Sequence, residues 1–366
     1  MKILYITLEG FNRKGEGVGK KINAQIKALR KLNNEVDKLY TDLQYIWLEE
    51  ENVLNIKKVG TIKNKYIKRL FFFSLIENIE FLKKYDCFYI RHFMATPSFI
   101  KFLDKFKDKK IIIEIPTYPV EGEYKTFSLK IMGIIDEVFR KKLYSYVSKI
   151  VTYSQDKTIY GVNCINVSNG IDLEENKLIK KEKNKKYIEF VSVSLCFFWH
   201  GIDRFLYSLL QYRKNGGEEK IKFHIVGEGI ETPKLKKIVE DNIELQDIVV
   251  FHGFKSGEEL DEIYNNSDIA LSSLGEYKRG LEKAAILKVR EYCARGIPFI
   301  LGYQDDSFEK NLPFYYQVPN DESLLDIEKI IEWYKNLKIT PKEIRKYAEE
   351  NVTWNKQMKK IIDEIK

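Results

Sequence analysis

The sequence is poor in the residues that usually build metal or redox sites. Its 366 residues include four cysteines and four histidines. The cysteines are scattered and form no CxxC pair. We therefore expect reduced thiols and assign none of them to a metal or a disulfide. The four cysteines are Cys87, Cys164, Cys196 and Cys293.

Membrane-spanning and secretory signals are also missing. No apolar run reaches the roughly 18 residues expected of a membrane-spanning helix. The segment 1–10 runs into a predicted strand, without the basic start and cleavage site of a signal peptide. Hydrophobic residues make up 44% and charged residues 32% of the chain. These features predict a soluble, globular, cytoplasmic protein.

Three familiar phosphate-binding motifs are absent. The chain contains no GxGxxG dinucleotide fingerprint, and the glycine loop at 10–19 does not complete the P-loop pattern. No DxD motif lies at the end of a predicted strand, since Asp305 and Asp306 are followed by Ser307 in a predicted loop. We therefore expect no dinucleotide cofactor.

Charge is unevenly distributed along the chain. Residues 1–172 contain 30 basic and 20 acidic residues, whereas the remainder contains 32 and 34. Within the first part, residues 57–110 contain 14 basic and five acidic residues. This excess predicts an anionic partner for the first half of the molecule.

An anionic membrane surface is the partner that we favour over nucleic acid, because residues 57–110 are also rich in aromatics. Basic and aromatic side chains together suit a lipid headgroup boundary. The competing interpretation is a lysine-rich surface over a phenylalanine-rich core. The aromatic residues concerned are Tyr66, Phe71, Phe72, Phe73, Phe81, Phe99, Phe102 and Phe106.

Strand and helix patterns alternate in both halves of the chain, which predicts two doubly wound, Rossmann-like α/β domains facing each other across a cleft. We place the N-terminal domain at 1–172 and the C-terminal domain at 187–340, and NGID (169–172) marks the crossing between them. The polar stretch 172–186 has the composition of a linker. We predict that 341–366 is a helix that packs back on the N-terminal domain.

The most informative segment is 288–300, KVREYCARGIPFI. It reads as an amphipathic helix that Gly296 ends, followed by a strand. Lys288, Arg290 and Glu291 place charge on an otherwise apolar helix. A carboxylate here can hold the two vicinal hydroxyls of a ribose while cations face a diphosphate. The alternative is an ordinary solvated helix face.

Glycine-rich strand ends supply one candidate anion-binding loop and two candidate nucleotide-binding strand tips. The first, 10–19, leads into a helix predicted from Lys20 to Lys31, and glycines there let backbone N–H groups approach a phosphate. In the second half, IVGEG contributes Gly227 and Gly229, and VVFHGF contributes His252 and Gly253. IVGEG has the form of a nucleotide-binding strand tip, and the backbone of VVFHGF could read the edge of a base.

Taken in order, these segments resemble the retaining glycosyltransferases of family 4, which have the GT-B fold. The resemblance runs over nearly the whole chain, through the first glycine loop, VSNGID, IVGEG, FHGF and EYCARGIP. It is closer to the branch found in bacterial surface-polysaccharide clusters. The segments that carry this closer resemblance are WHGIDR (199–204), EIPTYP (114–119), and SLG (273–275) with KRGL (278–281).

The resemblance implies that 1–172 is the acceptor-side domain and 187–340 the nucleotide-sugar-binding domain. In the latter, Gly227, Gly229, His252 and Gly253 would bind the donor. Glu291 matches the second glutamate of the family's paired-glutamate motif and would hold the donor ribose. The first glutamate falls at Lys283 and is missing. His200 replaces the usual phosphate-binding lysine, so Arg204 or Lys288 would supply the permanent positive charge.

In the first half, the resemblance implies that Gly17 and Gly19 let the loop approach the donor phosphates. Many relatives carry a histidine near the end of the strand at 111–115, where this chain has Glu114. Arg91 and His92 lie at the tip of the preceding predicted strand, on the acceptor side. For these last three residues an internal ion pair is the alternative.

The function implied is transfer of a sugar from a nucleotide-sugar donor to a glycan acceptor, lipid-linked, in surface polysaccharide synthesis. Such an enzyme would retain the anomeric configuration, need no metal, and work in the cytoplasm, peripherally on the inner face of the plasma membrane. One alternative is a catalytically silent GT-B subunit that recognises a partner or an acceptor, since Lys283 and His200 depart from the family pattern. A nucleotide-sugar epimerase is the third reading, although no general acid and base can be placed for it.

Overall fold

The structure is a computed structural model that describes residues 1–8, 17–42, 45–51, 57–61, 65–91, 94–120, 127–180 and 185–366. The chain forms two compact units. Unit 1 comprises Met1–Gly170 and Trp354–Lys366, and unit 2 comprises Ile171–Thr353. The chain passes between the units in the predicted NGID segment and again at the start of its last helix.

Unit 1 is built on a sheet whose described strands run in the order β4-β3-β2-β1-β5-β6-β7-β9-β8. The strands from β2 to β9 in this order are parallel, whereas β3, β4 and β8 pair antiparallel at the two edges. Short connections favour antiparallel neighbours, because a parallel pair needs a longer crossover. The strands are β1 (Lys2–Thr7), β2 (Glu35–Thr41), β3 (Tyr45–Glu49), β4 (Lys57–Thr61), β5 (Cys87–Arg91), β6 (Lys110–Ile115), β7 (Lys149–Thr152), β8 (Thr158–Ile159) and β9 (Val162–Asn166).

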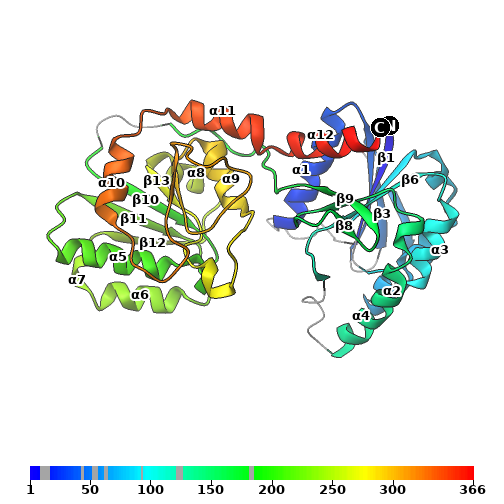
Figure 1. The fold of residues 1–366 in the computed structure, drawn as a ribbon, viewed down its shortest axis with the longest axis horizontal. Helices are drawn as coiled ribbons and strands as arrows, with labels where there is room; N and C mark the ends of the chain where they lie inside the picture. The colour runs from blue at the N-terminus through cyan, green and yellow to red at the C-terminus, as the bar shows by residue number, and fades with distance from the viewer. Residues whose placement is uncertain are drawn as a thin grey trace. The chain divides into compact units, whose positions relative to one another are not determined.

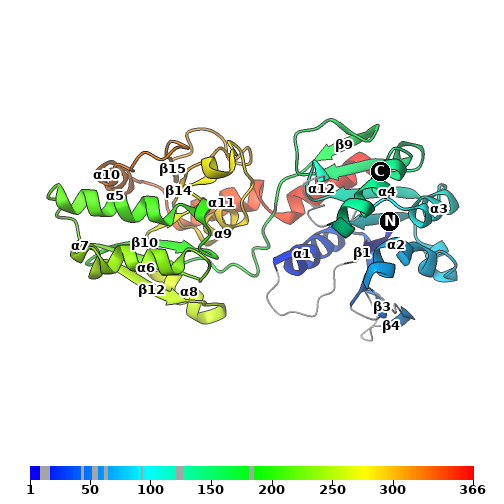
Figure 2. The same ribbon diagram turned by 90° about the horizontal axis from the view of Figure 1, so that it is seen from below.

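Helices cover both faces of this sheet (Figures 1 and 2). One face packs against α1 (Gly17–Lys31) and α12 (Trp354–Ile365), and the other against α2 (Lys65–Ile76) and α3 (Pro97–Lys105). Unit 1 also contains α4 (Phe127–Arg140) and two short 3₁₀ helices, η1 (Glu80–Lys84) and η3 (Leu143–Ser145).

The phenylalanines of residues 57–110 mostly form the core of unit 1. Five of the predicted membrane-facing aromatics are buried between the sheet and helices α2 and α3, so the prediction that they meet lipid is wrong. Apolar side chains gain more from this burial than from an interface shared with water. Phe71 alone is largely exposed among those whose exposure the structure describes, and Phe81 is partly buried. The buried five are Phe72, Phe73, Phe99, Phe102 and Phe106.

The C-terminal segment predicted as one helix over 341–366 is two helices. Helix α11 (Pro341–Asn351) packs against α9 (Leu287–Arg295) in unit 2, and only α12 belongs to unit 1. The break falls at Thr353, which pairs as an isolated bridge with Ile171 and is thereby drawn out of the helix. Gly170 allows the start of α12 to approach, since a Cβ there would lie 2.6 Å from the Trp354 backbone nitrogen.

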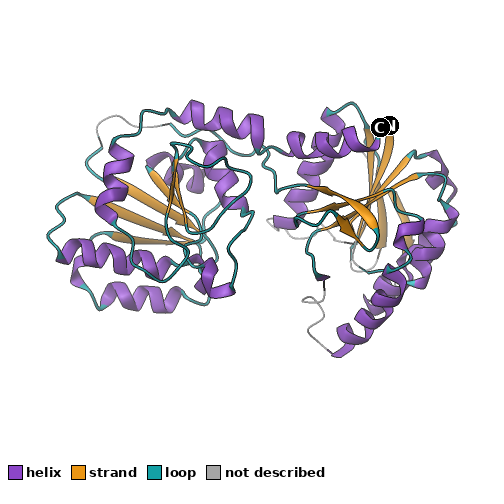
Figure 3. Cartoon of the chain, viewed as in Figure 1, coloured by secondary structure: helices purple, strands orange, loops and turns teal. Residues whose placement is uncertain are grey.

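Unit 2 has a fully parallel sheet in which the described strands follow the order β12-β11-β10-β13-β14-β15. Figure 3 draws the strands in orange and the helices around them in purple. The order reverses between β10 and β13, as in a dinucleotide-binding Rossmann fold. The strands are β10 (Ile188–Val193), β11 (Ile221–Val226), β12 (Val249–Gly253), β13 (Ile269–Leu271), β14 (Phe299–Leu301) and β15 (Tyr315–Gln317).

Two layers of helices enclose the sheet of unit 2 (Figure 1). Helices α5 (Ile202–Lys214), α6 (Thr232–Glu240) and α10 (Ile327–Lys335) pack on one face. Helices α8 (Gly257–Asn266), α9 and α11 pack on the other. Unit 2 also contains the short helix α7 (Ile243–Gln246) and two 3₁₀ helices, η4 (Phe198–His200) and η5 (Glu276–Arg279). Doubly wound α/β folding is therefore confirmed for both units.

One predicted helix boundary in unit 2 is wrong. The apolar pattern of the sequence predicts a helix over 281–294, whereas α9 begins at Leu287 and residue 286 is extended. The preceding residues pair with the segment after β14, through hydrogen bonds between Ala284 and Gln304 and between Gln304 and Glu282. The end of α9 is as predicted, because Gly296 takes the left-handed conformation with φ of 77°.

Candidate functional site

The predicted donor residues of unit 2 gather at the carboxyl ends of its strands. In open parallel sheets, ligands bind beyond these ends, close to the point where the strand order reverses. Here that point lies between β10 and β13. The segments that follow the strand ends are 194–201 after β10, 227–229 after β11, and 272–280 after β13.

Gly227 and Gly229 are required by the packing of the loops around them. A Cβ at Gly227 would lie 2.0 Å from the carbonyl oxygen of Ser194, and one at Gly229 would lie 1.6 Å from that of Leu195. Their N–H groups donate to the Gly253 carbonyl at 2.7 Å and to the Thr232 hydroxyl at 2.9 Å. Both glycines thus shape the loop, and in this structure their N–H groups are already paired.

A second close backbone contact joins the loop after β10 to the loop after β13. Gly201 has φ of 65°, and a Cβ there would lie 2.7 Å from the Leu274 carbonyl carbon. The N–H groups of Leu274 and Gly275 donate to the carbonyls of His200 and Trp199, at 2.9 and 3.1 Å. These bonds hold helices η4 and η5 side by side.

His200 is neutral at pH 7 in this arrangement. Burial lowers its pKa to about 4, helped by the positive charges of Arg279 and Lys288. Its Nδ1 accepts the Phe197 N–H at 2.9 Å, so the ring proton resides on Nε2. His200 therefore offers a neutral donor at the site rather than the positive charge of a lysine.

Glu291 and Lys288 form an ion pair in the first two turns of α9. Lys288 Nζ lies 2.9 Å from Glu291 Oε2, and the side chains are 36% and 16% exposed. Arg295 Nε lies 3.4 Å from the other carboxylate oxygen. Burial acts to raise the pKa of Glu291, but Lys288 and Arg295 outweigh it, and the pKa falls below its ordinary value. Glu291 is thus an ionised acceptor beside a partly exposed cation.

Arg204, one of the two predicted sources of permanent charge, is instead used inside unit 2. Its guanidinium is buried and donates to the backbone carbonyls of Ser323, Leu274 and Pro319 at 2.7 to 3.0 Å. A fourth contact reaches Asp321 at 3.4 Å. These contacts link the start of α5 to two distant segments, and they leave Lys288 as the better of the two predicted cations.

Lys283 occupies the position where the resemblance places the first glutamate. Its ammonium contacts both carboxylate oxygens of Asp306 at 3.1 Å, and both side chains are about half exposed. This pair joins the extended residues before α9 to the loop after β14. The structure therefore puts a cation with its own partner where a carboxylate was expected.

The side chain of His252, on β12, contacts the neighbouring strand β11 of the sheet. Its Nε2 lies 2.9 Å from Nδ1 of His224, whose other nitrogen lies 3.2 Å from Glu189. Burial lowers the pKa of His252, with smaller effects from His224 and Lys255. Gly253 accepts a hydrogen bond from Gly227 through its carbonyl. The side chain of His252 is therefore engaged within the sheet, and the backbone at 252–253 lies at the strand end.

Arg279 is a residue of this site that the sequence did not single out, although it lies in the KRGL segment. Its guanidinium carbon lies 4.9 Å from the centre of the Trp199 ring, and Nη1 lies 3.3 Å from Glu276 Oε2. Its side chain is 44% exposed, and its charge acts on His200. The sequence feature that could have identified it is its position in the segment after a predicted strand.

Glu114 is the centre of a buried polar network in unit 1. Its side chain is fully buried, and its Oε1 accepts from Arg91 at 2.6 Å. Its Oε2 accepts from Tyr89 at 2.7 Å and from Gln25 at 3.0 Å. Burial and the Glu114 charge keep the pKa of Tyr89 well above its usual value, so that hydroxyl stays a donor. Arg91 and Glu114 are thus brought together as an internal ion pair.

Three other predicted residues of unit 1 lie at or near the gaps in the described chain. Gly17 is the first residue of α1, and Gly19 follows within its first turn. The helix therefore begins three residues before the predicted Lys20. Residues 10–16 of the predicted glycine loop, and His92, fall outside the described residues.

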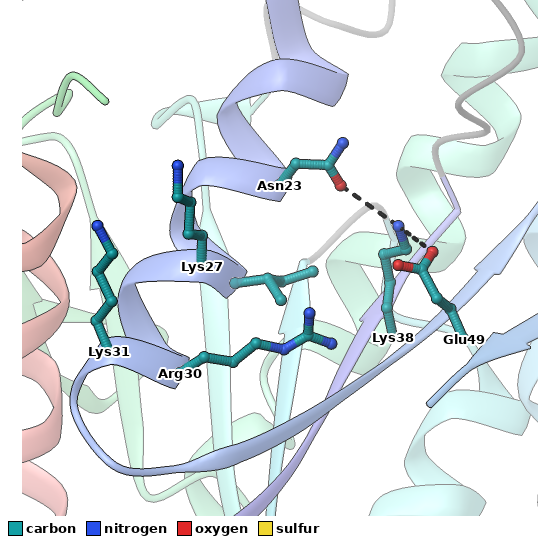
Figure 4. Close-up of a pocket in the computed structure, with 7 residues that line it drawn as sticks. Asn23, Lys27, Arg30, Lys31, Lys38 and Glu49 are labelled. Carbon is teal, nitrogen blue, oxygen red and sulfur yellow. Dashed lines mark hydrogen bonds and ion pairs between the residues drawn. The ribbon is translucent and has the colours of Figure 1, made fainter. Parts of the chain in front are cut away.

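A pocket of about 640 Å³ lies in unit 1 between α1 and strands β2 and β3. Figure 4 shows Lys38 directed at Asn23 and Glu49 there, at 3.3 and 2.6 Å. Arg30 donates to the Val36 carbonyl within the same wall. The side chains pair with one another, and no predicted site residue lines this pocket.

In the described part of the chain, no group of three or more histidine, cysteine, aspartate or glutamate side chains is placed to hold a metal ion. No helix among the same residues combines the length and apolar character needed to cross a bilayer.

Residues 174–350 match the family described as "Glycosyl transferases group 1". The match falls inside unit 2, which therefore is a glycosyltransferase group 1 domain. It includes Lys288, Glu291, Arg279 and His200. No curated protein matches the chain.

Solved structures resemble the chain over nearly its full length. A glycosyltransferase from Rickettsia africae ESF-5 has a TM-score of 0.67 at 15% identity, covering 99% of this chain and 97% of that one. Sucrose-phosphate synthase from Thermosynechococcus elongatus has a TM-score of 0.64 at 15% identity, covering 99% and 97%. Anabaena Alr3699/HepE, solved with UDP, has a TM-score of 0.63 at 12% identity, covering 99% of both chains. The predicted GT-B fold is thus confirmed.

Proposed function

We propose that this protein is a glycosyltransferase that moves a sugar from a nucleotide-sugar donor to a glycan acceptor. The observation that carries the proposal is the Glu291–Lys288 pair at the start of α9, inside the matched domain and at the carboxyl side of the parallel sheet. An ionised carboxylate suits ribose hydroxyls, and an ammonium beside it suits a diphosphate. UDP in the Anabaena structure supports a nucleoside diphosphate as the leaving group.

The chemistry follows from the charge that develops in the reaction. Breaking a sugar–phosphate bond leaves negative charge on the diphosphate, and fixed cations and N–H dipoles stabilise it. Lys288 provides such a cation, and the N-terminus of α9 adds a partial positive charge. Neutral His200 supplies a hydrogen-bond donor through Nε2. We propose that transfer retains the anomeric configuration and needs no metal, since the sequence lacks a DxD motif at a strand end.

For the acceptor we propose a lipid-linked glycan of surface polysaccharide synthesis, reached at the inner face of the plasma membrane. Support comes from the excess of basic residues in 57–110 and from Phe71 and Leu75, which expose 50% and 42% of their surface on α2. Replacing both with serine should lower binding to vesicles containing phosphatidylglycerol, because less apolar surface then enters the interface. Neutralising Lys101 and Lys105 on α3 should do so in a salt-dependent way; unchanged binding in both variants would remove the membrane from the proposal.

A catalytically silent GT-B subunit is the second candidate. The Lys283–Asp306 pair and the neutral His200 favour it, because both differ from what the resemblance implies for an active donor site. Such a subunit would bind a partner or an acceptor without turning over a nucleotide sugar.

A thermal-shift screen with EDTA present separates the two. Ligands that bind the folded state raise the melting temperature with the logarithm of ligand over dissociation constant. We expect one family of nucleotide sugars, with its free nucleoside diphosphate, to raise the melting temperature. That donor then enters a transfer assay in which product NMR reports the anomeric configuration. No shift with any donor, from protein that melts cooperatively, would favour the silent subunit.

A further inference from the structure

The turn after β13 carries a cation whose position is fixed from several sides. Arg279 lies in η5, and η5 is bound to η4 by the hydrogen bonds of Leu274 and Gly275 with His200 and Trp199. The backbone of the turn is further held by the Tyr277 N–H, which donates to Asn320 at 3.1 Å. The guanidinium therefore sits on a backbone whose place relative to His200 is determined.

Two side chains orient the guanidinium itself. The Trp199 ring lies 4.9 Å from its central carbon and Glu276 lies 3.3 Å from Nη1. Trp199 in turn stacks on Phe197, with ring centres 4.5 Å apart. A cation held over an indole face with a carboxylate on one nitrogen keeps its remaining N–H groups free of these contacts. Since 44% of the side chain is exposed, a ligand can reach it.

Glu276 is an unusual partner for an exposed arginine. Its side chain is 1% exposed, and Oε1 has no hydrogen-bond partner within the described residues. Burial raises its pKa, against the opposing effects of Ser273 and Arg279. A buried carboxylate with an unpaired oxygen is costly, so its presence beneath the turn is better explained by the orientation of Arg279 than by stability.

Other polar side chains at this strand end cannot add a second cation. Arg204 is occupied by backbone carbonyls and His200 is neutral, whereas Lys288 lies in the proposed site itself, beside Glu291. Lys278, next to Arg279, contacts Asp203 at 3.3 Å. A diphosphate carries more negative charge than Lys288 alone can offset, so a second permanent cation is needed beside it.

We infer that Arg279 contacts the diphosphate of the donor nucleotide and that Glu276 is the residue that positions it. This inference rests on the proposed function and adds a binding residue to the same site. The planar guanidinium can donate two parallel hydrogen bonds to phosphate oxygens. With Lys288 from α9, it would hold the leaving group from two segments of unit 2.

The test compares charge removal at two adjacent positions. Binding of UDP, ADP and GDP, and of uridine, adenosine and guanosine, is measured by calorimetry for the wild type, Arg279→Gln, Arg279→Lys and Lys278→Gln. With the nucleotide that binds wild type, we expect Arg279→Gln to lose at least tenfold in affinity and Arg279→Lys to lose less. Lys278→Gln should stay within about twofold, and nucleoside binding should not change in any variant.

A double-mutant cycle isolates the role of Glu276. Glu276→Gln should weaken binding of the same diphosphate in the wild-type background and have little further effect in Arg279→Gln, because a positioning residue acts only through its partner. Equal losses in both backgrounds would overturn the positioning role.

The failures of the inference and of the proposed function are distinguishable. Unchanged diphosphate affinity in Arg279→Gln, while the wild type binds, overturns the inference alone. If none of the three diphosphates binds the wild-type protein, both the inference and the proposed function are overturned. Melting temperatures near the wild-type value in Arg279→Gln or Arg279→Lys show that a measured loss is not unfolding.

Discussion

Each unit of this protein places a carboxylate next to cations near the carboxyl ends of its parallel strands, and the two arrangements differ in burial. In unit 1, Glu114 is fully buried and receives hydrogen bonds from Arg91, Tyr89 and Gln25. In unit 2, Glu291 keeps part of its surface and pairs with the partly exposed Lys288. The same residue types thus make a closed network in one unit and an accessible pair in the other.

The difference teaches that position at a strand end does not by itself identify a ligand-binding carboxylate. A buried charge is retained only when its partners satisfy it, and those partners then hold the surrounding elements together. Gln25 and Glu114 join α1 to β6 in this way. An accessible carboxylate such as Glu291 can exchange its partner for a ligand at lower cost.

The largest effect that we expect is from Glu114→Ala. Removing the carboxylate leaves Arg91 buried without its charge partner, which costs about 3–5 kcal/mol of unfolding free energy. Chemical denaturation measures it, with Glu114→Gln as the control that keeps the shape and part of the hydrogen bonding. Full stability together with lost transfer would reverse the comparison and make Glu114 a functional residue.

Glu291→Ala should show the opposite pattern. We expect nucleotide affinity to fall at least tenfold, about 1.4 kcal/mol, while the unfolding free energy changes by less than that. Calorimetric titration with the donor diphosphate and a denaturation curve on one preparation measure both quantities. Wild-type affinity in this variant would remove Glu291 from the site.

His200→Asn should reduce the loss of unfolding free energy that the protein undergoes when the pH is lowered. The folded-state pKa of His200, about 4, lies below its ordinary 6.5, so the unfolded state binds the extra proton between these values. The stability from neutral His200 is therefore present above pH 6.5 and lost as pH falls towards 4. Asparagine can accept the Phe197 N–H without titrating, so the variant should lose less stability over this range, as denaturation at pH 5 and 7.5 would show. An identical acid loss in both proteins would contradict this assignment.

The smallest effect should come from Lys283→Ala. Its pair with Asp306 is about half exposed on both sides, and exposed pairs contribute about 0–1 kcal/mol. A thermal melt at low and high salt measures it. A loss well above that range would show that the extended residues before α9 depend on this pair. Lys283 would then have a structural role, as Glu114 has in unit 1.

Much of the fold could be predicted because the deciding signals are local. The strand that ends at Ile115 and the end of α9 at Gly296 both follow from neighbouring residues. The predicted start of α9 and the prediction of a single helix over 341–366 were wrong for the opposite reason. Both helix boundaries depend on pairing with distant segments, at Gln304 and at Ile171, which outweighs local helix preference.

The candidate site divides in the same way. Glu291 and Lys288 lie three residues apart on one helix, so the sequence alone predicts that their side chains are close. The burial of Arg204 depends on hydrogen bonds to carbonyls that lie 70 and 115 residues away in the chain, and no sequence spacing predicts these contacts. Arg279 was missed because its neighbours Trp199 and His200 come from another loop.

By itself, the sequence determined the alternation of strands and helices, the glycines that close loops, and the charged helix at 288–295. These follow from conformational preference and from contacts one helical turn apart. Only the tertiary structure decided which charges are buried and which stay accessible. Burial and electrostatic environment depend on residues brought together from distant parts of the chain, and they separate Glu114 and Arg204 from Glu291 and Arg279.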